Sequence, residues 1–220
     1  PALGASILKS CLQKAGISAR VAYFGLDYAA RIGTTLYNAL LNSRTPLLQA
    51  EWTFAQAAFG HSFRAEREKD VGRPYPWATR DIRRAAREAE EWIQEIVAEI
   101  TDNPPRILIC SSMFQQNLAS LAVLRGVKER CKNVITIMGG PNTEGILGVG
   151  LLRRSPWLDY VCAGEGEETL PALCLGLLND TLPAQLPVGV IGQADLQQFA
   201  GVFDAKIPRA SMADMNQSPA

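Results

Sequence analysis

Three short apolar runs in the second half of the chain each end in a polar loop that leads into a segment with helical spacing. The runs are 106–110, 134–138 and 158–162. Short strands rich in β-branched residues, separated by helical patterns, are typical of a parallel sheet whose strands are buried on both faces. The pattern predicts an α/β fold with a doubly wound parallel sheet. The loops at the carboxyl ends of these strands would then line one crevice, where open α/β sheets bind ligands.

The beginning of the chain predicts one helix and one strand. Apolar residues at helical spacing over 3–15, with Gly16 after them as a C-cap, are followed by a strand-like run at 18–24. Because a βα architecture starts with a strand, a chain that opens on a helix is expected to lack its first strand.

A helical insertion is predicted over about 26–104, ahead of the three apolar runs. Its clearest segments are 47–59 and 77–100, each with apolar residues on one face. The arginines and glutamates of the second segment point away from that face, which is typical of a solvated surface. Within these segments Trp52 and Trp92 are interpreted as structural.

The end of the chain carries a weaker pattern. Residues 188–191 predict one more short strand, and from 193 onward the periodicity fades. The prediction is therefore an α/β domain over 1–192 and a linker over 193–220 that leads toward a further domain absent from this chain.

Charge and composition disfavour several classes of partner. Lys+Arg and Asp+Glu both count 22, so no global field attracts a polyanion, and no nucleic-acid partner is expected. No window approaches the roughly 18 continuous apolar residues of a membrane span, so no membrane partner is expected. The five cysteines are widely spaced and lack the short spacing of a zinc site. Together these features predict a cytoplasmic protein.

The loops narrow the chemistry of a ligand without naming it. None carries the lysine of a phosphate-binding P-loop. In 164–168 the carboxylates would occupy the positive end of a helix dipole and repel a pyrophosphate, so this segment is either an acidic binding loop or a helix cap that includes Thr169. The pair Gly139 and Gly140 either lets a bulky group approach the bare backbone or forms only a tight turn.

Four segments of the chain resemble one known family, in the same order along the sequence. They are 47–55, 112–122, 138–145, and 155–167 with 171–173. The chain is similar to the amino-terminal cobalamin-binding domain of radical S-adenosylmethionine proteins that mature ribosomally synthesised peptides (RiPPs). The resemblance implies a Rossmann-like (flavodoxin-like) domain that binds vitamin B12.

The sequence departs from the family at three places. Thr143 stands where a cysteine is expected, and Gln49 where a glycine is expected. The cluster-binding motif Cys-x-x-x-Cys-x-x-Cys and the barrel that follows it in the family are absent. The chain would therefore be the cofactor-binding part of a larger enzyme, with no catalytic residue of its own, and could not by itself cleave S-adenosylmethionine.

The resemblance also implies the chemistry of the whole enzyme. In this family a [4Fe–4S] cluster splits S-adenosylmethionine into a radical, and methylcobalamin can deliver a methyl group to a carbon radical on the substrate. The implied substrate is a precursor peptide and the implied reaction is C-methylation, as in a radical methyltransferase. Two alternatives stay open: a degenerate domain without cofactor that docks the precursor peptide, and a stand-alone flavodoxin-like binding module.

The resemblance assigns cofactor contacts to the three loops that follow the apolar runs. In related domains the first loop lies beneath the corrin ring, the second admits the nucleotide tail, and the third meets the ring amides or the tail. Carried onto this sequence, the cofactor-binding candidates are Ser111, Ser112, Met113, Phe114 and Gln115; Gly139, Gly140, Pro141 and Asn142; and Gly164, Glu165, Gly166 and Glu167. For Met113 and Phe114, ordinary core packing is the alternative.

No side chain is expected to bind the cobalt. Cobalamin domains that replace the cofactor's own base with histidine carry it in an Asp-x-His-x-x-Gly motif, and the single histidine, His61, has no aspartate two residues before it. The expectation is a base-off cobalamin without a histidine ligand, with the loop 111–115 shielding the lower face of the cobalt. His61 is interpreted as a surface or packing residue.

Overall fold

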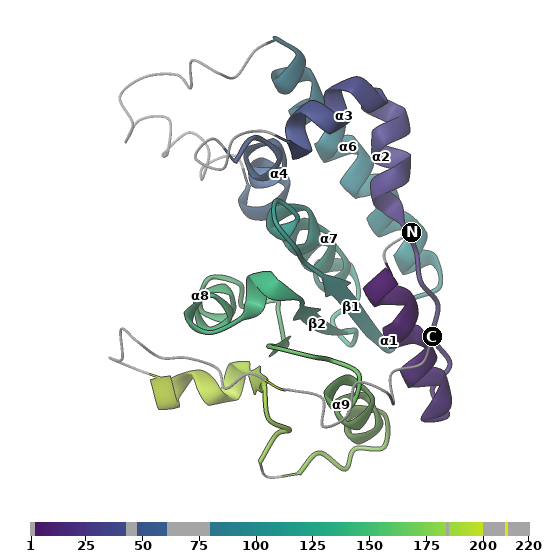
Figure 1. Cartoon of the computed structure of the whole chain (residues 1–220), viewed down its shortest axis with the longest axis vertical. Helices are drawn as coiled ribbons and strands as arrows, with labels where there is room; N and C mark the ends of the chain where they lie inside the picture. The colour runs from purple at the N-terminus through teal and green to yellow at the C-terminus, as the bar shows by residue number, and fades with distance from the viewer. Residues whose placement is uncertain (1–2, 43–47, 61–79, 184, 200–209, 211–220) are drawn as a thin grey trace. The chain divides into compact units, whose positions relative to one another are not determined.

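The chain forms two compact units, described here by a computed structural model. The structure describes residues 3–42, 48–60, 80–183, 185–199 and 210 (Figure 1). The sheet unit comprises 1–23, 105–113 and 133–220, and the helical unit comprises 24–104 and 114–132. His61 lies outside the described residues, so its surface role stays a prediction.

The sheet unit holds four strands in the described part of the chain. They are β1 (Ile107–Ser111), β2 (Ile135–Gly139), β3 (Tyr160–Cys162) and β4 (Val190–Gly192), in the spatial order β1-β2-β3-β4. The first three are parallel and β4 is antiparallel to β3. The α/β class with a mostly parallel open sheet is thus confirmed, and the four predicted strands form within two residues of their expected ends.

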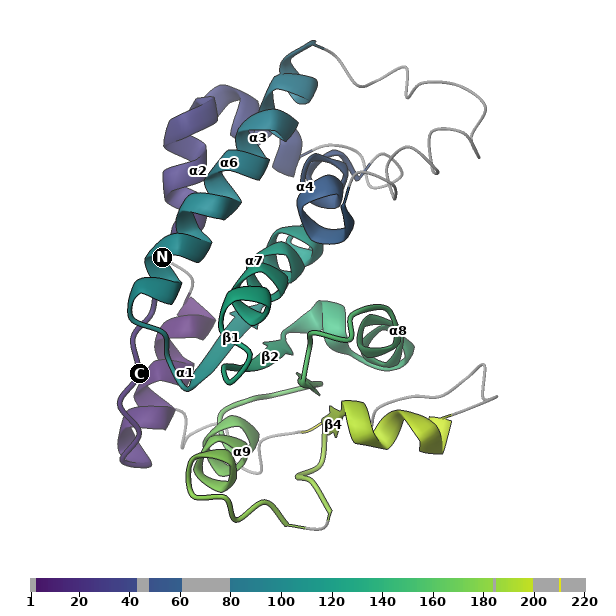
Figure 2. The same ribbon diagram turned by 180° about the vertical axis from the view of Figure 1, so that it is seen from behind.

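Among the described residues, the sheet unit contains five helical segments. They are α1 (Leu3–Lys14), the 3-10 turn η2 (Pro141–Thr143), α8 (Ile146–Arg154), α9 (Thr169–Leu178) and the 3-10 segment η3 (Gln193–Phe199). One face of the sheet, with Ile109 and Ile137, shares a buried core with Leu12 of α1 and Leu173 of α9. Figures 1 and 2 show α9 beside the sheet from both sides. The strand-end loops are therefore carried by a packed layer of strands and helices.

The predicted strand at 18–24 is wrong. Residues 17–23 form no ladder, and Phe24 already begins a helix. Burial nevertheless alternates as in a strand: Ile17, Ala19, Val21 and Tyr23 are half-buried, and the residues between them are exposed. The alternation reports an extended backbone over an apolar layer, but a strand also needs a neighbour to hydrogen-bond, and none of the described residues supplies one.

The order of the four strands bears on where a ligand could bind. A doubly wound sheet binds its ligand where the strand order reverses. The described strands follow one another in sequence order, so no reversal occurs among them. The carboxyl ends of β1, β2 and β3 still lie along one edge, because these strands are parallel neighbours.

The helical unit consists of five described helices. They are α2 (Phe24–Ile32), α3 (Thr34–Leu41), α4 (Gln49–Phe59), α6 (Arg80–Asp102) and α7 (Asn117–Arg130). The two predicted helical segments appear as α4 and α6; residues 47 and 77–79 lie outside the described part. A Cβ on Gly126 of α7 would approach a methyl carbon of Val97 on α6 to 2.6 Å. The missing side chain of Gly126 therefore permits close packing of these two helices.

Aromatic rings form the centre of the helical unit. The ring centroid of Tyr28 lies 5.0 Å from that of Phe54 and 4.8 Å from that of Trp92. The Tyr28 hydroxyl donates to the carbonyl oxygen of Ala85 at 2.7 Å, so the one polar atom of the ring is satisfied. Trp92 packs as the structural residue that was predicted, and Trp52 of α4 is buried as well.

The first residues of the predicted linker are folded onto the sheet unit. Residues 193–199 form η3, and the Gln193 side-chain amide donates to the carbonyl oxygens of Leu152, Ser155 and Leu158 at 3.0, 3.0 and 2.8 Å. Residues 200–209 and 211–220 lie outside the described part of the chain. Across the described helices, none has the length and apolar character needed to cross a membrane.

Candidate functional site

The loops after β1 and β2 are joined to each other by Ser112 and Asn142. The Ser112 amide donates to the Gly139 carbonyl at 2.8 Å, and the Ser112 carbonyl accepts from the Asn142 amide at 3.3 Å. The Asn142 side-chain amide donates to the Ser112 hydroxyl at 2.9 Å. Ser112 is buried. The polar atoms of these two predicted contact residues therefore form hydrogen bonds that hold the two loops together.

Gly140 is required by the protein's own backbone. Its φ is +100°, a conformation that side chains with a Cβ rarely adopt. A Cβ there would also lie 2.5 Å from the carbonyl oxygen of Ser112 and 3.0 Å from its nitrogen. The glycine is therefore needed whether or not a ligand approaches, and Pro141 follows it to begin η2.

Gly139 is different, because nothing in its surroundings demands a glycine. An added Cβ would meet the carbonyl oxygen of Cys162 at 3.6 Å and its Cβ at 3.8 Å, which are ordinary van der Waals distances. Its φ is not among the positive values. Of the four glycines predicted to bind the cofactor, Gly139 has room beside its backbone and no internal reason to be glycine.

Thr143 ties the second loop to the end of β3. Its hydroxyl lies 2.7 Å from the Gly140 carbonyl and 2.6 Å from the Cys162 carbonyl, and the residue is fully buried. Sequence reasoning treated Thr143 only as a departure from the family pattern and missed this role. A thiol is a weaker donor than a hydroxyl, so a cysteine could not replace these contacts at equal strength.

The third loop is shaped by neighbours within the sheet unit. Gly164, with φ +90°, forms a bridge with Ala210, and the Glu165 amide donates to the Ala210 carbonyl at 3.0 Å. A Cβ on Gly166 would lie 3.1 Å from a methyl carbon of Leu8 on α1. Both glycines therefore have a structural cause.

One glutamate of this loop, Glu168, lacks the side-chain cap that the capping alternative requires. Glu168 occupies the N-cap position of α9 and makes no side-chain hydrogen bond to the helix. Burial raises the pKa of the Cys11 thiol, and the charge of Glu167 raises it further. The charge of Glu167 thus acts on the Cys11 thiol of α1, while Glu168 makes no side-chain cap.

The first loop passes from one unit to the other between Met113 and Phe114. Met113 is 45% exposed and Phe114 is 83% exposed, so core packing does not account for either side chain. Phe114 has a φ of +51°, a left-handed conformation that is uncommon for a bulky residue. Ser111, at the end of β1, is exposed as well.

Gln115 belongs to the helical unit and is fixed there. Its side-chain oxygen accepts from the Ala50 amide at 3.0 Å, and its side-chain nitrogen donates to the carbonyls of Leu40 and Leu41 at 3.4 Å. These bonds connect the start of α7 to α3 and α4. The predicted cofactor residue therefore has a clear structural role inside its own unit.

Glu51 occupies the amino terminus of α7, a role that spacing did not predict. Its carboxylate accepts from the amides of Asn117 and Leu118 at 2.9 and 2.7 Å. Burial raises the pKa of Glu51, and the two backbone hydrogen bonds partly oppose that rise. With this end of the dipole already holding an anion, those amides are not available to a phosphate. The only earlier signal was the Glu-Trp pair within the resembling segment.

The described residues contain no group of three or more His, Cys, Asp or Glu side chains that could hold a metal ion. The cysteines are free thiols. Burial raises the pKa of Cys162 to about 12 and that of Cys174 to about 11. Such thiols stay protonated near neutral pH and are poor ligands and nucleophiles.

Comparison with known proteins leaves the resemblance as an expectation. No family model matches the chain, and no curated protein or solved structure matches it.

Proposed function

We propose that the chain is the cobalamin-binding domain of a B12-dependent radical S-adenosylmethionine enzyme that C-methylates a ribosomally synthesised precursor peptide. The observation that carries the proposal is the position of the three resembling loops. They follow β1, β2 and β3, which are adjacent parallel strands, and so begin along one edge of the sheet. That edge is where open α/β sheets bind their ligands.

The residues at this edge fit a bulky ligand at one clear place. Gly139 offers bare backbone with room for a contact, and Ser111, its partner in the β1–β2 register, is exposed. The proposal gains no support from Gly140, Gly164 and Gly166, because the surrounding protein already requires a glycine at each of these positions. The proposed contact set therefore centres on Ser111, Met113 and Gly139.

Cobalamin, when bound, would supply a carrier for the methyl group, while the protein supplies position and shelter. The Ser112 and Asn142 hydrogen bonds would keep the first two loops at a fixed separation, and Thr143 would hold the second loop against β3. The proposed cofactor is a base-off cobalamin without a histidine ligand; the single histidine, His61, lies outside the described residues. S-adenosylmethionine and the [4Fe–4S] cluster would belong to a separate domain of the enzyme.

We also propose that the sheet is Rossmann-like, with one more strand beyond β1. The amide of Ile135 bonds the carbonyl of Arg106, and the amide of Ser112 bonds that of Gly139. By alternation, Ile107, Ile109 and Ser111 turn their backbone groups to the other edge. We place the expected first strand, which would precede α1 in the chain, at that edge of β1. If residues 17–23 then paired with its far side, the strand order would reverse at this point, as in a doubly wound sheet.

Retention of the corrin tests the proposal. The full-length protein, reconstituted with hydroxocobalamin and desalted, should keep the corrin absorbance in stoichiometric amount. Gly139→Ala should lower retention by about tenfold in affinity if the ligand approaches this backbone closely. Gly150→Ala, on an open surface of α8, is the matched control and should retain cobalamin like the parent.

A second function is favoured by the finding that neighbouring residues of the protein itself require Gly140, Gly164 and Gly166. A domain whose loops are shaped by their own packing could keep this fold without a cofactor and serve to dock the precursor peptide. Loss of all corrin absorbance on the desalting column, with the circular dichroism spectrum unchanged, would support this function and contradict cobalamin binding.

A further inference from the structure

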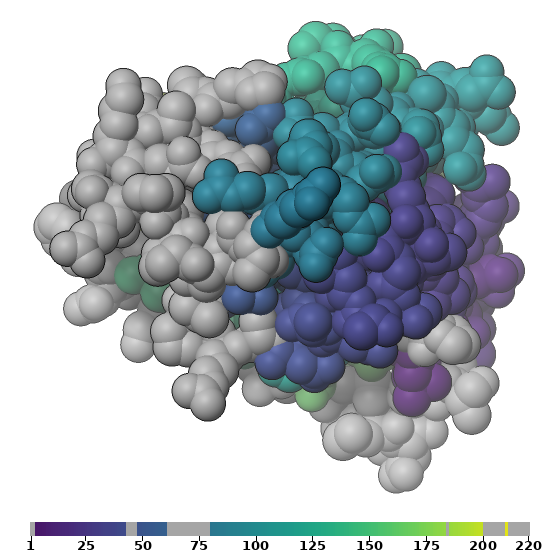
Figure 3. Space-filling model, turned by 90° about the horizontal axis from the view of Figure 1, so that it is seen from above, coloured from purple at the N-terminus to yellow at the C-terminus, as the bar shows by residue number. Residues whose placement is uncertain are grey.

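The outward face of α6 carries two blocks of opposite charge. Arg80, Arg84 and Arg87 are spaced i, i+4 and i+7, so they share one face of the helix, and all three are exposed. Glu91 and Glu95 continue the same stripe toward the end of the helix. Figure 3 shows α6 (teal) on the surface of the helical unit beside α2 and α3 (violet-blue).

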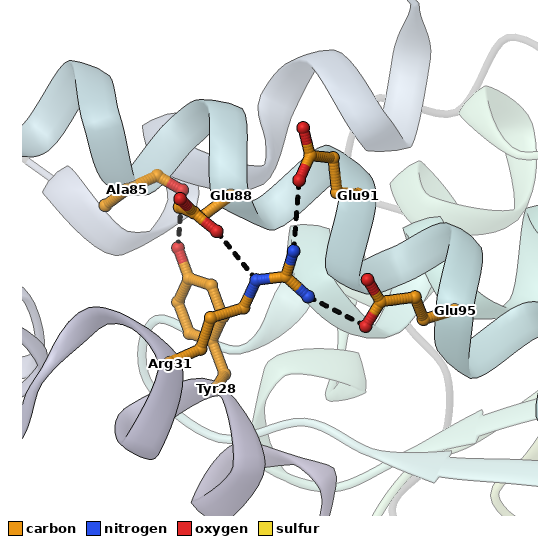
Figure 4. A network of polar contacts seen from close by, with 6 residues as sticks. All are labelled: Tyr28, Arg31, Ala85, Glu88, Glu91 and Glu95. Carbon is orange, nitrogen blue, oxygen red and sulfur yellow. Dashed lines mark hydrogen bonds and ion pairs between the residues drawn. The ribbon is translucent and has the colours of Figure 1, made fainter.

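Arg31 of α2 binds the carboxylates that could otherwise neutralise these arginines. It pairs with Glu88 at 2.7 Å, with Glu91 at 3.0 Å and with Glu95 at 2.7 Å (Figure 4). Glu88 stands four residues after Arg84, and Glu91 four after Arg87, which is the spacing of helical ion pairs. Both glutamates instead form ion pairs with Arg31 of α2.

The three arginines are here called the arginine face. Their positive charges are paired with few carboxylates of their own helix. Arg84 lies 4.0 Å from Asp81, and both side chains are exposed, so this pair contributes little. Within the described part of the chain, Arg80 and Arg87 form no ion pair. The helix dipole does not stabilise these arginines either. It favours cations near the carboxyl end of a helix, whereas the arginines lie toward the amino end of α6 and its last turn has no basic residue.

We propose that the arginine face docks an acidic segment of a partner polypeptide. Guanidinium groups bind carboxylates through paired hydrogen bonds. Successive arginines rise by about 6 and 4.5 Å along the helix. Carboxylates on alternate residues of an extended peptide repeat every roughly 6.6 Å, which is a close match to the first spacing.

A nucleic acid fits this surface less well. The stripe turns acidic at Glu91 and Glu95, so a phosphate backbone running along α6 would meet carboxylates. The chain's formal net charge is zero, so no wider field would offset that repulsion. The arginine face lies in the helical unit and involves none of the proposed cobalamin contacts, so this inference does not rest on the proposed function.

Fluorescence anisotropy with a short fluorescein-labelled peptide of alternating glutamate and serine tests the inference. The purified chain should bind this probe, and R80Q/R84Q/R87Q should weaken binding by about tenfold or more. The control K14Q/R20Q/R130Q removes the same number of exposed positive charges elsewhere and should bind like the parent. Added salt should weaken the parent's binding.

Three outcomes would overturn the inference. The first is no binding of the glutamate probe by the parent at low salt, and the second is equal loss in the two triple variants. The third is tighter binding of a labelled single-stranded RNA than of the peptide. Circular dichroism of both variants checks that the fold is intact, and a peptide of alternating glutamine and serine shows whether charge is what the surface recognises.

Discussion

At the residue scale, Gly139 and Gly140 are adjacent glycines, but the fold requires a glycine only at Gly140. Gly140 combines a positive φ with a backbone oxygen where its Cβ would be, whereas Gly139 meets only ordinary contacts. A sequence shows the pair as one motif. The structure separates a glycine that the fold needs from one that it does not, and only the second can report on a ligand.

Gly140→Ala is expected to destabilise the protein by about 1–3 kcal/mol or more, from backbone strain together with the overlap on Ser112. Gly139→Ala should change the free energy of unfolding by less than about 1 kcal/mol. Urea unfolding followed by circular dichroism measures both. Equal stability of the two variants would contradict the separate causes assigned to the two glycines.

Glu51 predicts a pH dependence of stability with a definite sign. Because burial holds its pKa above the ordinary value in the folded protein, the folded state binds this proton more tightly than the unfolded chain. Its contribution is fully present below the unfolded pKa of about 4.3, and is lost as the pH rises through the raised pKa.

Glu51→Gln removes this titration. The difference in unfolding free energy, parent minus variant, should therefore fall as the pH rises from about 4.3 toward neutrality. Urea unfolding at several pH values measures it, with the exposed Glu99→Gln as control. A difference that stays constant or grows with pH would show that Glu51 is not held in the way described.

At the element scale, one guanidinium group adds three ion pairs to the packing of α2 on α6, beside the contacts of Tyr28 with Ala85 and Trp92. Arg31 connects three glutamates on successive turns, and without it their like charges would face one another. Arg31→Met should lower the unfolding free energy by about 1 kcal/mol, since the side chains are partly exposed. Arg31→Lys should recover part of the loss, and high salt should narrow the gap between parent and Arg31→Met. A gap independent of salt would point to packing instead.

Periodicity predicted most elements, because burial imposes it directly. The apolar stripe of α6 and the three parallel strands follow from residues that must face a core. The segment 17–23 alternates equally well and forms no strand, because pairing depends on a neighbour that a local pattern does not show. The roles of Thr143 and Glu51 were missed for a related reason: their partners lie 19 and more than 60 residues away.

The candidate site was predicted as three loops with named cofactor-contact residues in each. The order of the loops along one edge follows from three parallel neighbouring strands. The sequence could not show which glycines the protein's own packing requires. Gly166 and Gly164 are constrained by Leu8 and Ala210, which are distant in sequence. Core packing of Phe114 was a reasonable alternative for a large aromatic residue, but its side chain is exposed.

At the scale of the whole molecule, the buried thiols of the sheet unit report on its unfolding. With pKa values of about 12 for Cys162 and about 11 for Cys174, thiolate is scarce near neutral pH. N-ethylmaleimide should label the half-buried Cys131 first in the native protein, and these two only when the sheet unit opens. Peptide mapping by mass spectrometry follows the order. Rapid native labelling of Cys174 would contradict the burial described.

The division into two units has a consequence for how the protein is made. The backbone passes from one unit to the other four times, after residues 23, 104, 113 and 132. By the time a ribosome has delivered residue 132, the helical unit has all its segments, whereas the sheet unit has only α1 and β1. Domains generally fold as units during synthesis, with the earlier one first. The helical unit would thus mature on the ribosome while β1, already made, still waits for β2 to be synthesised.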